Sequence, residues 1–569
     1  MANNIVEQKR SIIHGVPSHA EAGIGALTIP GYLREVTTRF AEREAVVMHA
    51  ADGLVTRWSY STLWDKSVEV AKALIAGGIG CDTRVGILMT NRPEYLAALF
   101  GTALAGGVPV VFSTFSTPTE LEQLLSLSAV SVLLFEASVL KTDFCALLAA
   151  LEPRIRIAAP GQLGSEKFPY LRQLIYLDAV TVGAATAPAD MSCLKRWDEY
   201  LHRGASIVDH VVDARAATRS PADAGGLFFS SGTTSLPKGI LHSQRAFALQ
   251  WWRYPRLAGV DEVVRCWTAN GLFWSGNITL AVGLAFTTGG TLVLQPYFEP
   301  EATLDLIEKE RISFLHGRPH QWARMQESAK WKTADLGSLR YITRGDILRE
   351  HPTVASTWTM PMGYGNTETL SICTSRAYEV NPDAEIGSFG IPLPGVILKI
   401  VDAETGKVLP IGSSGEICVK GPTLMLGYIG KAVEETFDQE GYFHTGDGGY
   451  VDEDGRLFWQ GRITEIIKTG GANVSPVEID EALALYPGVR RAQTVGLPHE
   501  TMGEVIVSCI VPYEGVTLEI EALNTFLKAR LASYKLPKQI LFFREEELEI
   551  TGSGKVKVMQ LRQLVSSRL

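Results

Sequence analysis

Segments with helix-like and strand-like patterns alternate along most of the chain, and this alternation constrains the fold more than any other feature. Residues 93–104 begin with a proline and predict a helix, and the apolar run 108–112 after them is typical of a buried strand. Farther on, residues 303–311 predict a helix and 312–315 a strand. Such alternation favours an α/β architecture in which helices cover largely buried sheets.

The length of the chain and a change of pattern near residue 461 predict two domains. At 569 residues, the chain is too long for one compact domain. Beyond this boundary come a strand-like run at 465–468, a glycine turn at 470–471 and the start of a helix, with proline at its first position, at 475–478. A strand at 505–511, a helix at 519–531 and a strand at 539–543 follow. We therefore expect a large domain over residues 1–461, a hinge at 462–464 and a small α+β domain over 465–569.

Charge, cysteine usage and hydropathy exclude several classes of protein. Lysine and arginine number 53 against 62 aspartates and glutamates, and the resulting net charge of −9 would repel a nucleic acid. The 7 cysteines form no C-x-x-C pair and no metal-ligand spacing, which is typical of a reducing compartment. No signal peptide opens the chain, and its most lipid-like run, 96–112, is interrupted by glycines and a proline. We expect a cytoplasmic protein without a membrane span, although the final Ser567, Arg568 and Leu569 are close to a peroxisomal address.

The segment LFFSSGTTSLPKG at 227–239 has the composition of a phosphate-binding loop. An apolar strand runs into small and hydroxyl residues whose backbone and side-chain donors suit an anion, and Lys238 adds a positive charge. A Walker loop requires glycine before the lysine and serine or threonine after it, whereas this chain has Pro237 and Gly239. The segment therefore predicts an anion-binding loop of another kind, and the alternative is a polar surface turn.

Three further segments offer chemistry that is weak when each is taken alone. GYGNTE at 363–368 follows an apolar, strand-like approach and ends in a carboxylate that could hold Mg²⁺, but a solvated turn has the same pattern. GYFHTGD at 441–447 places Asp447 beside a hairpin that turns at Asp454 and Gly455, and Arg462 follows. TGSGK at 551–555 could carry a lysine to another domain or be a flexible tail.

In this order and spacing, the four segments resemble the adenylate-forming superfamily of acyl- and aryl-CoA synthetases, peptide-synthetase adenylation domains and beetle luciferases. The resemblance covers about residue 58 to residue 569 and includes GSFGIPLPG at 387–395 and GRITEIIKTGGANVSPVEID at 461–480. It implies a large domain of α/β sheets with a β-barrel-like subdomain, and a small mobile C-terminal domain. It also implies that a carboxylate attacks the α-phosphate of Mg-ATP to give an acyl-adenylate and pyrophosphate, after which CoA displaces AMP.

The resemblance also implies roles for individual residues. The expected catalytic residues are Lys555, Thr367 and Glu368, with Glu368 as the Mg²⁺ ligand and Tyr364 as the ring that stacks on adenine. The expected contacts with ATP or AMP are Ser230, Ser231, Gly232, Thr233, Thr234, Lys238, Tyr364, Gly365, Asn366, Asp447 and Arg462, and those with CoA are Lys468, Gly470 and Gly471. The expected acyl pocket contains Trp274, Arg344, Gly345 and Asp346.

The sequence departs from the family at positions that bear on the hinge and on the acid. The hinge residue is usually aspartate or lysine, but here it is Thr464. Arg344 stands in the usual Gly-Gly-Ala run, and residues 316–320, HGRPH, are more basic than the apolar wall of fatty-acyl enzymes. These residues favour an acid with at least one polar or anionic group besides its reacting carboxylate, and the alternative is that Arg344 faces solvent or pairs with Asp346. Residues 268–277 lack the aspartate that holds an amino group, which argues against an amino-acid substrate.

Three enzyme classes fit this resemblance. An acid–CoA ligase is the leading interpretation, because the IKTGG run near the expected CoA arm is complete. A luciferase-like oxygenase would expose the adenylate to O₂, and an adenylation enzyme would load a carrier-protein phosphopantetheine in trans. The expected cofactors are ATP, Mg²⁺ and CoA, and the expected partner is a small carboxylic acid.

Overall fold

Two sheets, rich in parallel strands, form the framework of the large part of the chain. The computed structural model describes residues 10–50, 53–178, 191–230, 237–342, 346–378, 387–469, 472–499, 502–531, 535–550 and 555–569. Within these ranges, the first sheet contains, in spatial order, β10 (Leu194–Arg196), β9 (Gln173–Leu177), β6 (Val132–Glu136), β4 (Arg84–Leu88), β5 (Val108–Val111), β11 (Ala224–Ser230), β12 (Lys238–Ser243) and β20 (Gly427–Tyr428). The second contains β15 (Phe314–Leu315), β13 (Arg265–Thr268), β14 (Thr291–Leu294), β2 (Glu44–His49) and β3 (Val55–Ser59).

Helices lie between these two sheets and on their outer faces, as the alternation predicts. The inner helices are α1 (Ile29–Arg39), α2 (Tyr60–Ala76), α3 (Pro93–Leu104), α8 (Gln244–Leu257) and α9 (Ser275–Thr287), of which α3 contacts β4 and β5 on one side and β2 on the other. The outer faces are covered by α4 (Pro118–Ser128) and α5 (Phe144–Leu151) on the first sheet and by α10 (Pro300–Lys309) and α11 (Pro319–Glu327) on the second. α6 (Trp197–His202) and α7 (Asp209–Ala217) pack against α2 at the side of the core between the sheets. The α/β prediction is confirmed.

Strand β6 shows how both faces of the first sheet are buried. Val132 and Leu134 pack into the core between the two sheets, whereas Leu133 and Phe135 pack into a second core against α4 and α5. Because successive side chains of a strand point to opposite faces, a strand covered on both sides reads as a continuous apolar run. This is why the sequence shows apolar runs rather than strict alternation.

A third sheet corresponds to the expected barrel-like subdomain. Its strands are β1 (Ile12–His14), β18 (Ile397–Val401), β19 (Gly415–Lys420), β21 (Phe443–Val451) and β22 (Leu457–Arg462), and in the described residues they run as an open path from β1 to β22. The predicted hairpin is present, since β21 pairs antiparallel with β22. A two-stranded ladder of β16 (Thr374–Ser375) and β17 (Ile391–Pro392) lies nearby in the sequence.

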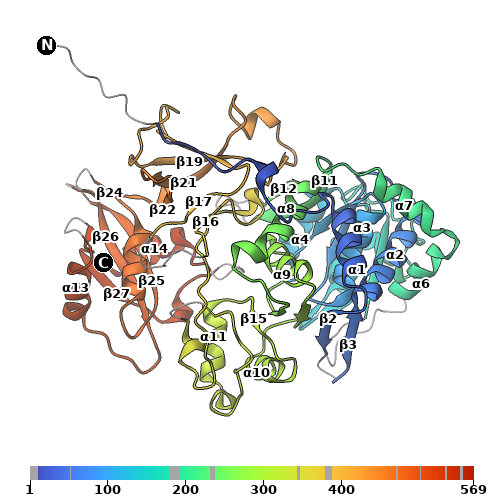
Figure 1. The fold of residues 1–569 in the computed structure, drawn as a ribbon, viewed down its shortest axis with the longest axis horizontal. Helices are drawn as coiled ribbons and strands as arrows, with labels where there is room; N and C mark the ends of the chain where they lie inside the picture. The colour runs from blue at the N-terminus through green and yellow to red at the C-terminus, as the bar shows by residue number, and fades with distance from the viewer. Residues whose placement is uncertain are drawn as a thin grey trace.

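The C-terminal part forms its own sheet and cores (Figure 1, orange to red). The sheet contains β24 (Ala472–Val474), β23 (Ile467–Thr469), β26 (Gly503–Pro512), β25 (Val489–His499) and β27 (Gln539–Phe542), covered by α12 (Pro476–Ala484), α13 (Ile520–Lys528) and α14 (Val558–Arg568). The predicted strand at 465–468 begins only at Ile467, because residues 463–465 form the short 3₁₀ turn η9 (Ile463–Glu465). The chain therefore changes sheets between Arg462 and Ile467.

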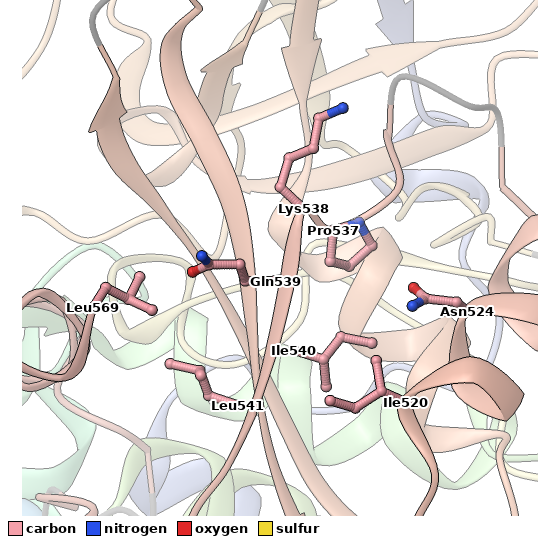
Figure 2. Close-up of a pocket in the computed structure, with 8 residues that line it drawn as sticks. All are labelled: Ile520, Asn524, Pro537, Lys538, Gln539, Ile540, Leu541 and Leu569. Atoms are coloured by element: carbon pink, nitrogen blue, oxygen red, sulfur yellow. The ribbon is translucent and has the colours of Figure 1, made fainter.

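A groove of about 330 Å³ opens beside β27 on this C-terminal sheet (Figure 2). In the described residues β27 pairs with β26, and the side chains of Ile520 and Leu569 approach it from α13 and from the end of α14. Among the described residues, none that is expected to bind ATP, CoA or the acid lines this groove. Across the described ranges, no helix has the length and apolar character that a membrane crossing requires.

Candidate active site

The expected phosphate loop joins two antiparallel strands. Ser230 at the end of β11 is the ladder partner of Lys238 at the start of β12. Ser231, Gly232, Thr233 and Thr234 lie outside the described residues. The segment thus leads from one strand into an antiparallel strand, whereas a Walker loop leads into a helix whose N-terminus faces the phosphates. The ammonium of Lys238 lies 5.2 Å from the ring centroid of Tyr428.

The turn that carries Thr367 and Glu368 is tightly fixed by its own backbone. Thr367–Thr369 is a 3₁₀ turn, and the side chains of Asn366 and Thr369 each accept a hydrogen bond from the backbone N–H of the other. Gly365 is required, because a Cβ at this position would lie 1.7 Å from the carbonyl oxygen of Ser371. The strand-like approach expected before Gly363 is wrong, since residues 354–362 contain no strand.

The carboxylate of Glu368 is oriented by a tyrosine that the motifs do not include. The Tyr428 hydroxyl donates to Glu368 Oε1 at 2.8 Å, and the backbone N–H of Met425 donates to the Glu368 carbonyl at 2.8 Å. Burial and the charge of Glu368 raise the pKa of Tyr428, so the phenol stays a donor. Nothing in the sequence around Tyr428 marks it as part of a site, because β20 reaches this position by pairing with β12.

Asp447 is a buried carboxylate held from two sides. Only 3% of the residue is exposed. The Tyr364 hydroxyl donates to Oδ2 at 2.6 Å, and Arg462 Nε lies 3.2 Å from Oδ1 across the β21–β22 ladder. Burial raises the pKa of Asp447, while Arg462 and Tyr364 counteract this rise by stabilising the ionised form. The structure thus joins three residues expected at the nucleotide, and the link between Tyr364 and Asp447 is one that sequence reasoning missed.

A second carboxylate braces the backbone that leads to Asp447. Glu416 Oε2 accepts a hydrogen bond from His444 Nδ1 at 2.8 Å, and Oε1 accepts one from the backbone N–H of Gly446 at 3.0 Å. With Cys418, whose sulfur lies 3.5 Å from His444 Nδ1, these side chains form a group of potential metal ligands in the described residues. Burial raises the pKa of the Cys418 thiol, which opposes the thiolate that a metal would need.

The two lysines expected from the small domain lie in different surroundings. Lys555 is exposed. Burial raises the pKa of Asp447 and of Glu465, and the positive charge of Lys555 opposes this rise at both carboxyls, so Lys555 lies on the side of the site that contains Asp447. Lys468 is exposed on β23, and its backbone N–H donates to Glu504 Oε2 at 2.8 Å. Gly470 and Gly471 lie outside the described residues.

Of the residues expected in the acyl pocket, those that the structure describes follow the carboxyl ends of strands in the second sheet. Trp274 precedes α9 and is half-buried, and Asp346 precedes a short 3₁₀ turn, whereas Arg344 and Gly345 lie outside the described residues. β13 and β15 are parallel neighbours, so the residues after them meet at one edge. Asn270 Nδ2 donates to the His316 carbonyl there, at 3.4 Å.

Arg318 lies at this same edge and has no carboxylate partner among the described residues. It is exposed and precedes α11. Burial and the nearby charge of Arg318 lower the pKa of the half-buried His316 imidazole to about 3, so His316 is neutral near pH 7. The edge therefore offers one permanent cation beside neutral hydrogen-bonding groups.

Comparisons with known proteins agree with this arrangement. The AMP-binding enzyme family matches residues 33–429, and its C-terminal domain matches residues 478–555. An indoleacetate–CoA ligase of Aromatoleum aromaticum is 33% identical over 90% of this chain and 94% of its own, and a feruloyl-CoA synthase of an Amycolatopsis species is 28% identical over 92% and 96%. In fold, the chain is similar to the anthranilate CoA ligase AuaEII, with a TM-score of 0.76 and 22% identity over 97% of this chain and 100% of that one. The chain therefore belongs to the AMP-binding enzymes, within the adenylate-forming superfamily, and is an AMP-forming acid–CoA ligase.

Proposed function

We propose that the chain activates a carboxylic acid bearing a further polar or anionic group, and that the cluster around Asp447 holds the nucleotide. In the first step a carboxylate oxygen bonds to the α-phosphorus of ATP and the bond to pyrophosphate breaks. In the second step the sulfur of CoA bonds to the acyl carbon and AMP leaves. The observation that carries the assignment is the convergence of Tyr364, Arg462 and the charge of Lys555 on one buried carboxylate.

Each residue of the cluster has a distinct proposed task. Asp447 accepts hydrogen bonds from the ribose hydroxyls, and the positive charge of Arg462 favours the ionised form of this carboxylate. Tyr364 lies against the adenine and fixes Asp447 through its hydroxyl. Lys555 stabilises the negative charge that develops as the acid approaches the α-phosphate. Their shared property is pre-organisation, which is the main contribution a protein makes to phosphoryl-type chemistry.

Glu368 is the proposed magnesium ligand. Mg²⁺ is usually bound by one or two carboxylates together with substrate phosphates. The half-buried Glu368 carboxylate fits this requirement, because Tyr428 holds one of its oxygens at a defined position. When bound, the ion would neutralise charge on the phosphates.

The boundaries 1–461, 462–464 and 465–569 are proposed as large domain, hinge and small domain. Support comes from the change of sheet between Arg462 and Ile467 and from the separate cores of the C-terminal part. A rotation at the hinge would withdraw Lys555 and bring Lys468, with the neighbouring Gly470 and Gly471, to the site for the CoA step.

The proposed acid class rests on the edge that contains Arg318. The Arg318 guanidinium, which has no carboxylate partner within the described ranges, and the neutral His316 imidazole can bind a carboxylate or a phenolic or carbonyl oxygen at the far end of the acid. Arg344 is proposed to contribute from the expected acyl pocket. Unbranched fatty acids offer no group that would replace the water around these cations.

The test measures AMP release and thioester formation across a panel of carboxylic acids, with and without CoA. Aryl and dicarboxylic acids should exceed unbranched fatty acids in kcat/KM, and Arg318→Leu should reduce this preference. Long-chain fatty acids as the best substrates would refute the acid class. Adenylation without thioester formation from free CoA would instead favour a carrier-protein acceptor.

A further inference from the structure

The turn that carries Thr367 and Glu368 has an unusual backbone. Leu370 and Ser371 have φ values of 50° and 88°, in a region of backbone conformation that residues other than glycine rarely adopt. Two such residues in succession persist only where the surroundings determine their conformation, and they concentrate at functional sites. Groups from the surrounding elements must therefore hold this turn in place.

Gln250 supplies hydrogen bonds to the strained part of the turn. Its side chain lies on α8 in a residue that is 1% exposed. Nε2 donates to the carbonyl oxygens of Leu370 at 2.7 Å and Ile372 at 2.8 Å, with that of Thr369 at 3.4 Å. One amide group thus binds the carbonyls on both sides of Ser371.

His242 supplies a bond to the first residue of the same turn. It lies on β12 and is fully buried, and its Nε2 donates to the Thr367 carbonyl at 2.8 Å. Burial lowers the pKa of His242 to about 3, so the ring is neutral and its one proton lies on Nε2. Thr367 is thereby fixed to β12.

Both donors come from the segment that follows the phosphate loop. β12 begins at Lys238, and α8 begins directly after β12 ends at Ser243. We infer that His242 and Gln250 are positioning residues for adenylation, because they fix Thr367 and Glu368 relative to the strand that carries Lys238. This inference rests on the proposed function, and neither side chain is expected to touch a substrate.

The alternative is that both residues only stabilise the fold, and Gln244 provides a matched control. Gln244 is a fully buried glutamine on the same helix, and its side chain also bonds backbone groups, donating to the Ala224 carbonyl at 3.1 Å and accepting from the Ile29 N–H at 2.9 Å. Its bonds lie away from the 366–372 turn. Gln250→Leu and Gln244→Leu therefore remove the same buried amide, but only the first releases the turn.

The experiment measures two half-reactions on the full chain: pyrophosphate release from acid and ATP across a Mg²⁺ series, and AMP release from synthetic acyl-adenylate with CoA. Gln250→Leu should lower kcat/KM for ATP by roughly 10-fold or more and raise the Mg²⁺ concentration for half activity, because small misplacements of reacting groups are costly. The thioester half-reaction should change much less. Gln244→Leu should lower the melting temperature without shifting the Mg²⁺ midpoint.

A second pair of variants guards against misfolding. His242→Leu should reproduce the adenylation defect, and His242→Gln, whose amide can still donate to Thr367, should restore much of it. Equal losses in both half-reactions, or an unchanged Mg²⁺ midpoint in folded Gln250→Leu and His242→Leu, would overturn the inference. Absence of acid-dependent pyrophosphate release in the unmodified chain would instead refute the proposed function.

Discussion

Replacing Tyr364 by phenylalanine is the smallest change that tests the proposed nucleotide clamp, which consists of Tyr364, Asp447 and Arg462. The variant loses one oxygen atom, which donates to Asp447 Oδ2 at 2.6 Å between residues that are 5% and 3% exposed. The ring, which is expected to lie against the adenine, remains. A hydrogen bond to a charged group contributes about 1.5–3 kcal/mol. Because 1.4 kcal/mol corresponds to about tenfold in affinity, KM for ATP should rise by roughly 10- to 100-fold.

The same change should shift the pH dependence. Burial already raises the pKa of Asp447, and the Tyr364 hydroxyl counteracts that rise. Without the hydroxyl the pKa of Asp447 rises further, so the acid limb of kcat/KM for ATP should move to higher pH, since the proposed role of ionised Asp447 is to accept hydrogen bonds from the ribose hydroxyls. A carboxyl with a raised folded-state pKa stabilises the fold at low pH and loses this contribution as pH rises through that pKa. As pH rises through the folded-state pKa of Asp447, the free energy of unfolding of the variant should therefore fall more than that of the parent.

The assay is steady-state pyrophosphate release as a function of ATP concentration and pH, with circular dichroism to confirm folding. A parallel titration with the acid at saturating ATP serves as the control, because the acid is proposed to bind at the Arg318 edge and not at the Asp447 cluster. An unchanged KM for ATP together with an unchanged acid limb would refute the role given to the Tyr364 hydroxyl.

Three further changes test other parts of the site. Lys555→Ala should slow adenylation by roughly 10²-fold or more and leave thioester formation from synthetic acyl-adenylate nearly unchanged; equal damage to both half-reactions, measured on one preparation, would contradict the alternating domain. Glu368→Gln should reduce adenylation by orders of magnitude while the fold survives, because Mg²⁺ favours a charged carboxylate; near-normal rates at limiting Mg²⁺ would exclude it as the ligand. Gly365→Ala should lower the melting temperature and abolish adenylation, since its Cβ would meet the Ser371 carbonyl at 1.7 Å; a soluble, fully active variant would show that the turn can open without loss.

The sequence predicts those parts of the fold whose signals are local. The helix expected at 93–104 is α3 at those bounds, because a proline at its first position and the glycines after it mark both ends. The helix expected at 303–311 begins earlier, at Pro300, where the Glu299 side chain accepts hydrogen bonds from the first backbone N–H groups. Before Gly363, apolar residues suggest a strand, but Trp358 packs into the core and donates to the Ala258 carbonyl instead of joining a ladder.

Site residues were predictable where they lie in motifs and unpredictable where they act through a neighbour. Asp447 and Arg462 stand in recognisable segments, and the β21–β22 register joins them. Tyr428, His242 and Gln250 meet the turn at 366–372 only after distant strands and helices have packed. A buried hydrogen-bond partner of this kind is defined by the fold and leaves no local spacing in the sequence.

The chain passes from the nucleotide clamp to the expected pivot within one residue. Arg462 ends β22 opposite Asp447, and η9 starts at Ile463. A rotation about the backbone bonds of residues 463 and 464, within the proposed hinge, would carry the whole C-terminal sheet and leave this ladder pair in place. An acyl-adenylate is a mixed anhydride that water hydrolyses, so its escape between the two steps would waste the ATP already cleaved. If the proposed pivot is correct, its position would allow the protein to present first one face of the small domain and then another while the activated intermediate stays bound.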